Sequence, residues 1–363
     1  MQTSLLSSSS LINPKTNPFS PQPPAAGPVF ASSIAANYQG HPFSGTASPS
    51  PLKKELNPTF PFESLEKARQ NFPWAWDSCF ISQDLSFVPQ LGRVEDELSR
   101  FSQQDVSLKK MLKSWLGYLL YSNTASQALN STQLQTFRIS PLNLFAGYFQ
   151  APSLRLAFTH HQSQEALIFT TALYIAEALQ LSLDQCIETT YRSRNEWGLV
   201  AFENSLPASV LSSSITPTSG EVFLSAALYY TLSRSFFLAS SWAVLCSPNF
   251  CQEFPKLGQV IKNVYRCVHQ QYCFGLKFAS QITHFESPQN IPLVQEEYVE
   301  TVKVALTLES QWTHYILPQE TFGISSRSVV QYLKFLTDQA FKSIGAQPQF
   351  KVGVPYPWEP FTL

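Results

Sequence analysis

The sequence predicts an all-α protein in which long helices pack together as a bundle. Several segments repeat apolar residues at three- and four-residue spacing, which is the period of one helix face. No alternation of apolar and polar residues typical of a β-strand runs for any length, and the joins are short and rich in Pro, Gly, Ser or Thr. About eight such helices must bury their apolar faces against one another, which favours a bundle in one domain.

The ordered part of the chain is expected to begin near Phe60, and the aromatic cluster 72–76 is expected to anchor on the folded body. The predicted long helices span 105–121, 153–181, 183–192, 221–246, 257–282, 295–315 and 326–344. The segment 153–181 has little polar face and no internal Gly or Pro, so we expect it to be buried. A Ser/Thr/Pro-rich linker is expected at 206–220. Gly345 is expected to end the last helix, because Gly readily adopts the backbone conformation of a helix C-terminus.

Composition limits the classes of function. The chain has 363 residues, of which 44% are hydrophobic, so it can bury a large core. Its net charge of −1 and pI of about 6.6 provide no basic field, which argues against nucleic-acid binding. The most apolar stretch, 222–246, is interrupted by Arg234 and is not expected to span a membrane. Six Cys residues without a CxxC pair favour free thiols in a reducing compartment, and therefore a soluble cytoplasmic protein.

The first 60 residues differ in composition from the rest of the chain. They are rich in Ser, Pro, Asn and Gln and contain no acidic residue before Glu55. Such a segment buries too little apolar surface to offset its ordering entropy, so residues 1–60 are predicted to be a disordered tail. They lack the charged and apolar regions of a signal peptide. The predicted domain is 61–358, followed by a short end at 359–363.

Glu165 is the ionisable residue that opens the apolar part of segment 153–181. A buried carboxylate needs a metal, a cation or a proton, because an unpaired buried charge costs several kcal/mol. His160 and His161 lie one helical turn before it and could share its face. We favour a partly exposed helix start over a metal site for that pair, and a core or boundary position over a ligand role for His269. No standard motif for zinc, phosphate or nucleophilic catalysis is present.

From Phe72 to Trp358 the chain resembles the small, radical-generating (beta) subunit of class I ribonucleotide reductase, in particular its chlamydial-type members. The pieces that carry the resemblance are Pro73-Trp74-Ala75-Trp76, Ala151-Pro152-Ser153-Leu154-Arg155, Glu165-Ala166-Leu167, Leu173-Tyr174-Ile175-Ala176-Glu177, Tyr229-Tyr230, Phe236-Phe237, Phe274-Gly275, Leu317-Pro318, Gly323-Ile324, Tyr332-Leu333 and Tyr356-Pro357-Trp358. The resemblance implies the ferritin-like helical bundle of that family.

The family holds two metal ions, iron or iron with manganese, through four carboxylates and two His. Carried over residue by residue, the six ligand positions fall on Asn123, Glu165, Ile168, Arg234, Val268 and Gln271. Only Glu165 keeps a ligand of the family's type. The position of the radical Tyr, or of the Phe in chlamydial types, falls on Ala172. The resemblance therefore implies a degenerate site, without a cofactor of its own and without catalytic residues.

The family's route for radical transfer is also altered. Its Trp near the N-terminal segment falls on Phe87, and the Asp partner of that Trp falls on Cys267. Family members continue after the equivalent of Trp358 with a tail that contains a relay Tyr and docks on the large subunit. This sequence ends at Leu363, so we expect weak or absent docking to the large subunit.

We predict that Arg234 pairs with Glu165 in the former metal cavity, while Ile168, Val268 and Ala172 fill the remaining space. A two-pronged Arg–carboxylate pair is the geometry that makes burial of both charges tolerable. The alternative is that Arg234 turns away and Glu165 is protonated. Glu165 is thus interpreted as half of a structural ion pair rather than as a catalytic residue.

Three functions are compatible with this sequence. The first is a non-catalytic paralogue in deoxyribonucleotide synthesis that forms a heterodimer with an active small subunit, or a homodimer of its own. The second is a stand-alone structural or interaction protein that kept the ferritin-like fold and has no reductase role. The third is an enzyme of different chemistry, for which the sequence supplies no nucleophile, base or cofactor site. The first is preferred.

Overall fold

The computed structural model describes residues 72–83, 94, 97, 100–101, 106–123, 141–149, 151–206, 219–233, 235–286 and 288–353. Its helices are α4 (Pro73–Gln83), α6 (Val106–Asn123), α7 (Pro141–Tyr148), α8 (Pro152–Ala178), α9 (Leu183–Glu196), α10 (Leu199–Ser205), α12 (Ser219–Leu232), α13 (Ala239–Leu245), α14 (Pro248–Glu253), α15 (Pro255–Phe285), α16 (Ile291–Ile316) and α17 (Ser326–Ser343). The described residues contain no strand, so the predicted all-α class is confirmed. The predicted tail 1–60 and the end 359–363 lie outside them.

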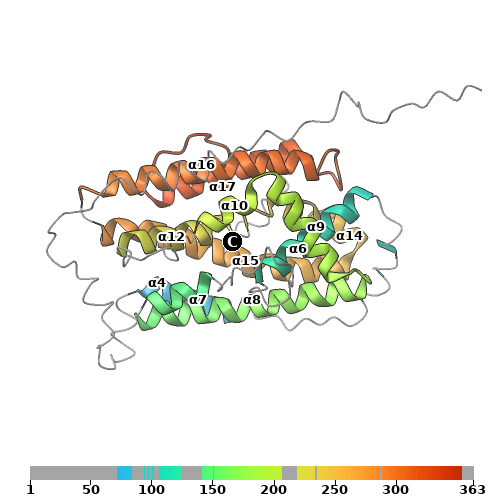
Figure 1. Ribbon diagram of the computed structural model, residues 1–363, viewed down its shortest axis with the longest axis horizontal. Coiled ribbons are helices and arrows are strands. Elements are labelled where there is room, and N and C mark those ends of the chain that lie inside the picture. The colour runs from blue at the N-terminus through green and yellow to red at the C-terminus, as the bar shows by residue number, and fades with distance from the viewer. Residues whose placement is uncertain are drawn as a thin grey trace, which may run out of the picture.

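The helices form an elongated bundle (Figure 1). In that view α16 and α17 run side by side along one edge, α8 runs along the opposite edge with α4 and α7, and α12 and α15 lie between. Trp74 of α4 packs its ring 5.1 Å from the ring of Phe274 and 5.5 Å from that of Phe278, both on α15. The N-terminal aromatic cluster therefore anchors this segment on the core, as the sequence suggests.

The ends of the helices follow local sequence signals. Ser182 caps α9, since its side chain accepts a hydrogen bond from the backbone N–H of Gln185. Ser325 and Ser328 cap α17 reciprocally. Gly345 has φ +79° directly after α17, so the predicted helix stop is confirmed.

The predicted continuous helix 221–246 is wrong. The structure ends α12 at Leu232, makes turns at Ser233 and over 235–238, and begins α13 at Ala239. Two of the backbone carbonyls in this break accept side-chain hydrogen bonds from other helices. Tyr118 of α6 donates to the Ser233 carbonyl over 2.8 Å, and Arg194 of α9 donates to the Phe237 carbonyl over 3.1 Å. Helical spacing cannot reveal this break, because the compensating donors are distant in sequence.

Two pairs of helices approach closely at glycines. A Cβ added at Gly117 of α6 would lie 2.3 Å from the carbonyl oxygen of Cys186 on α9. At Gly275 of α15 it would lie 2.8 Å from the backbone nitrogen of Thr231 on α12. Both contacts are with backbone, which cannot move aside cheaply, so these positions require Gly for the observed packing.

Two further features of the described residues concern the cysteines and the apolar helices. Cys186, Cys246, Cys251, Cys267 and Cys273 are free thiols. No single described helix has both the length and the apolar content of a membrane span, and only α8 and α9 taken together, bent by 112°, pass that test.

Candidate functional site

Four helices meet at the place where the resemblance positions a two-metal centre. The α6 helix ends at Asn123, and α8 contributes Glu165 and Ile168. The chain just after α12 approaches α15 here, because the Ser235 hydroxyl donates a hydrogen bond of 3.4 Å to the carbonyl of Val268. The side chain of Asn123 and all of Arg234 lie outside the described residues, so nothing is said of their contacts.

The described side chains at this place are mostly hydrocarbon. Ile168 and Ala172 are fully buried on α8, and Val268 on α15 is 1% exposed. Hydrocarbon side chains cannot bind a metal cation. Their removal from water stabilises the folded state. The positions that the resemblance assigns to one His, one Glu and the radical residue are therefore part of the packed core.

Side-chain amides form hydrogen bonds between α8 and α15 next to these apolar residues. Gln271 of α15 donates its amide N–H to the side-chain oxygen of Gln164 on α8 over 3.4 Å, and Gln164 donates to the side-chain oxygen of Gln270 over 3.3 Å. Gln164 and Gln271 are 2% and 5% exposed. Both distances are long for a hydrogen bond, so the bonds are weak. They nevertheless pair amide groups that would be costly to bury without a partner. Gln271, at the position of the family's second His, is used in this way.

Glu165 is buried, with 7% of its surface exposed. The predicted ion pair between Glu165 and Arg234 stays a prediction, because Arg234 is not described. Within the described part of the chain, no group of three or more His, Cys, Asp or Glu side chains is placed to hold a metal ion. The described residues at the ligand positions thus do not fit the two-metal centre that the resemblance implies for the family.

His161 is not at a partly exposed helix start, and that prediction is wrong. It lies within α8, is 1% exposed, and its Nδ1 is 2.9 Å from the Tyr230 hydroxyl on α12. Burial, followed by the charge of His160, lowers the pKa of His161 to about 3, so the ring is neutral at physiological pH. The prediction for His161 failed because, in the sequence, the apolar run of segment 153–181 begins only after Glu165, whereas burial of α8 begins before His161.

His269 is a boundary residue, as predicted. Its ring stacks between those of Tyr265 and Tyr272, with centroid distances of 5.7 and 5.8 Å. Burial lowers the pKa of His269 to about 4. Cys267, at the position of the family's Asp, is 1% exposed, and burial raises the pKa of its thiol to about 11. Both groups are therefore uncharged at neutral pH. Phe87 lies outside the described residues.

A second buried polar cluster was not predicted from the sequence. Arg194 of α9 is fully buried and donates from two guanidinium nitrogens to one oxygen of Glu203 on α10, at 2.5 and 3.2 Å. The other carboxylate oxygen of Glu203 accepts a hydrogen bond of 2.5 Å from the Tyr121 hydroxyl. Glu309 of α16, also fully buried, has an oxygen 3.7 Å from Arg194. This Arg194 cluster joins α6, α9, α10 and α16.

Burial and neighbouring charges shift the pKa values of Arg194 and Glu309 in this cluster. Burial opposes the charge on Arg194, but Glu203, followed by Tyr121 and Glu309, holds its pKa above the usual value. Burial raises the pKa of Glu309 well above its usual value, although Arg194 acts in the opposite direction. Arg194 therefore keeps its charge beside Glu203, and burial favours the protonated form of Glu309. Neither oxygen of Glu309 has a hydrogen-bond partner among the described residues.

Aromatic rings complete the enclosure of Arg194. The guanidinium carbon lies 4.7 Å from the ring centroid of Tyr118 and 5.3 Å from that of Trp312. Such contacts favour a cation that water does not reach. The sequence signal was weak, because Arg194 occurs among polar residues of an amphipathic helix and its partners are 9 and 115 positions away.

Two comparisons with known sequences bear on the family. Residues 185–356 match the family model described as ribonucleotide reductase, small chain. Ribonucleoside-diphosphate reductase subunit beta of Chlamydia pneumoniae is 20% identical over 296 residues, which make up 80% of this chain and 83% of that protein. Over these residues the chain is thus similar to the ribonucleotide reductase small chain.

Solved structures support the fold of the small-chain family. The ribonucleotide reductase R2 subunit from Clostridium botulinum aligns with a TM-score of 0.64 at 12% identity, over 80% of this chain and 87% of its own. The ribonucleotide reductase Rnr4 homodimer from Saccharomyces cerevisiae aligns with a TM-score of 0.56 at 13% identity, over 82% and 85% of the two chains. The chain thus has the ferritin-like bundle that the resemblance implies.

Proposed function

We propose that this chain is a small-chain family member that has no two-metal or radical centre of its own and acts as a non-catalytic partner of an active small subunit in deoxyribonucleotide synthesis. The observation that carries the proposal is the complete burial of Ile168 and Val268 at two positions where the family binds metal. A metal centre there would need charged or imidazole ligands, and hydrocarbon groups offer no lone pair.

The formal charges at the six ligand positions support the absence of a two-metal centre. Four carboxylates tolerate proximity only when cations lie between them. In this chain the six ligand positions hold one carboxylate, Glu165, and one guanidinium, Arg234, whose formal charges cancel without any metal. The remaining volume is filled by Ile168, Val268 and Ala172. A chain of this kind keeps the bundle without requiring metal for its stability.

The proposed partner is a small subunit that retains its metal centre, and the proposed location is the cytoplasm. Preservation of the family's bundle over most of its length supports an assembly role, since a paired subunit needs the fold and not the centre. The yeast structure is described as a homodimer of Rnr4. We propose a homodimer as the form of this chain when the partner is absent.

The first test is the metal content of the purified full-length chain. Protein from cells supplied with ample iron and manganese is compared by mass spectrometry with an active small subunit purified in parallel. We expect far less than one metal ion per chain, and no tyrosyl-radical signal in electron paramagnetic resonance after addition of Fe(II) and oxygen. One or two metal ions per chain would contradict the proposal.

The second test is capture of the chain from native cells, read for the small and large reductase subunits. We expect an active small subunit in the captured material, and altered deoxyribonucleotide pools when the chain is depleted. Capture of neither subunit, together with unchanged pools, would favour a stand-alone structural or interaction protein instead.

A further inference from the structure

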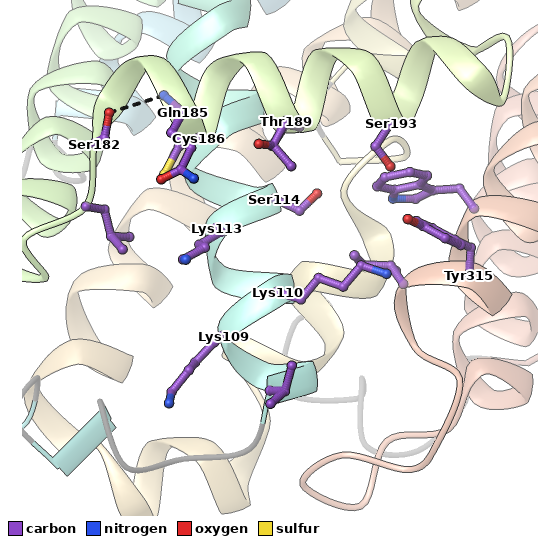
Figure 2. A pocket seen from close by; sticks show the side chains of 15 residues that line it. Lys109, Lys110, Lys113, Ser114, Ser182, Gln185, Cys186, Thr189, Ser193 and Tyr315 are labelled. Carbon is purple, nitrogen blue, oxygen red and sulfur yellow. Dashed lines mark hydrogen bonds between the residues drawn. The ribbon is translucent and has the colours of Figure 1, made fainter. Parts of the chain in front are cut away.

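A pocket of about 420 Å³ opens between α6, α9 and α16, away from the former metal position. Figure 2 shows α6 and α9 as its two long walls, with Tyr315 of α16 at one end. Its volume falls in the range of small-molecule sites. Its lining residues are Val106, Lys109, Lys110, Lys113, Ser114, Leu181, Ser182, Gln185, Cys186, Thr189, Thr190, Ser193, Trp312, Tyr315 and Ile316.

The charge of this pocket is one-sided. Lys109, Lys110 and Lys113 follow one another along the α6 wall, and no Asp or Glu is among the lining residues. The whole chain has 24 basic and 25 acidic residues, so a pocket with three cations and no acid departs from the average. None of the three lysines forms an ion pair with a described residue. Such a field attracts anions and repels metal cations.

The opposite wall supplies hydroxyl and amide groups. Ser182, Gln185, Thr189 and Ser193 line the α9 side in succession (Figure 2). Hydroxyl and amide side chains donate hydrogen bonds to phosphate oxygens, while lysines provide point charges for them. The first turn of α9 also lies here, where backbone dipoles favour negative charge. The wall therefore complements the lysines for an anion held between the two helices.

The end of the pocket at α16 is aromatic. Tyr315 is 37% exposed, and Trp312 beside it has a ring centroid 5.4 Å away. The ammonium of Lys110 lies 3.8 Å from the centroid of the Tyr315 ring, so a cation and a ring face already meet here. A flat aromatic group of a ligand can contact this end while its charged group contacts the lysines.

The shape of the pocket has a structural cause. The helices α6 and α9 touch at Gly117, where a Cβ would lie 2.2 Å from the Thr190 hydroxyl. The lining residues of α6 all precede Gly117, so the pocket lies on the N-terminal side of this contact along α6. This close contact fixes the approach of α6 to α9 beside the pocket.

We propose that this pocket binds a small organic phosphate that carries an aromatic group, with the phosphate at Lys109 and Lys113 and the aromatic group at Tyr315. The proposal does not depend on the absence of a metal centre or on a partner subunit. It excludes duplex nucleic acid, which is too large for a pocket of this volume.

Calorimetric titration of the full-length chain with ATP, pyrophosphate and adenosine tests the proposal. ATP combines both chemical features, and the other two probes contain one each. We expect one ATP site per chain, with affinity about tenfold or more above that of pyrophosphate or adenosine. No ATP binding at millimolar concentration, or equal affinity for pyrophosphate, would overturn the proposal.

Two variants locate the binding. Lys109→Gln/Lys113→Gln should weaken ATP binding about tenfold or more, because two cations near the phosphates are lost. Lys262→Gln/Lys277→Gln removes the same charge from α15, which does not line the pocket, and should leave the affinity within about twofold. Equal losses of ATP affinity in the two variants would mean that only the net charge of the protein matters, and would overturn the proposed site.

Chemical protection of lysines in the wild-type chain locates the bound ATP without any substitution. Lysine acetylation is quantified by mass spectrometry with and without ATP. We expect ATP to protect Lys109 and Lys113 while Lys277 reacts at an unchanged rate. Unprotected Lys109 and Lys113 in the presence of saturating ATP would place the ligand elsewhere and overturn the proposal.

Discussion

The surroundings of Ile168 and the surroundings of Arg194 are both buried between helices, but they differ in how they contain charge. Around Ile168 and Val268 the described side chains are mostly hydrocarbon or amide, with Glu165 nearby. The guanidinium of Arg194 is paired with Glu203, lies 3.7 Å from Glu309, and contacts the rings of Tyr118 and Trp312. Burial raises the pKa of Glu309. The comparison shows that the buried charge of Arg194 is matched by a counter-charge on Glu203 and by a hydrogen bond to the Phe237 carbonyl.

The largest effect is expected from Arg194→Met. The change leaves Glu203 and the Phe237 carbonyl without their buried donor, and loss of one partner of a buried pair costs about 3–5 kcal/mol of unfolding free energy. Urea denaturation followed by circular dichroism measures the loss. The matched control is Arg192→Met, two residues away, whose pair with Glu188 is exposed and should contribute below about 1 kcal/mol. Equal costs would remove the distinction between the two arginines.

The next effect is expected from Ile168→Ala, at a position that the resemblance assigns to a metal ligand. Truncation of a fully buried Ile leaves a cavity and costs about 3 kcal/mol. The same urea titration, carried out with and without added Fe(II) or Mn(II), should show a loss that metal does not restore. Recovery of stability with metal would mean that the cavity still binds cations and that the two regions are less different than described.

A smaller effect, visible as a pH dependence, is expected from Glu309→Gln. The folded-state pKa of Glu309 is raised, so its contribution is present below the unfolded pKa and declines as pH rises toward the folded value. Glutamine cannot ionise. The stability of the variant relative to wild type should therefore increase with pH above about 4.5, by at most about 1.4 kcal/mol per pH unit. Urea midpoints at pH 6, 7 and 8 measure this difference, and a flat difference would mean that Glu309 is ionised in the fold.

The smallest effect is expected from Tyr230→Phe. The hydroxyl of Tyr230 is hydrogen-bonded to Nδ1 of His161, and its loss should cost about 1 kcal/mol. The pKa of His161 is about 3, so the cost should be equal at pH 6 and pH 8. A cost that changes across this range would indicate a titrating histidine near the former metal position, in contrast to the neutral interior described above.

The fold was largely predictable because local rules determine it. Apolar periodicity placed the long helices, and Gly345 ended α17 as expected. The break after Leu232 and the burial of His161 were missed, since both depend on contacts with residues far along the chain. The Arg194 cluster was missed for the same reason. At the former metal position, the residue types predicted the apolar character of Ile168 and Val268, while the proposed pair of Glu165 with Arg234 awaits direct observation.

The break between α12 and α13 has a consequence for how the molecule unfolds. The Ser233 and Phe237 carbonyls are satisfied only when α6 and α9 are in place to donate to them. Separation of either helix exposes a polar group of the break, so local opening of α6 or α9 is coupled to fraying of α12. Native-state hydrogen exchange should report these three segments as one cooperative unit, although they are not contiguous in the chain.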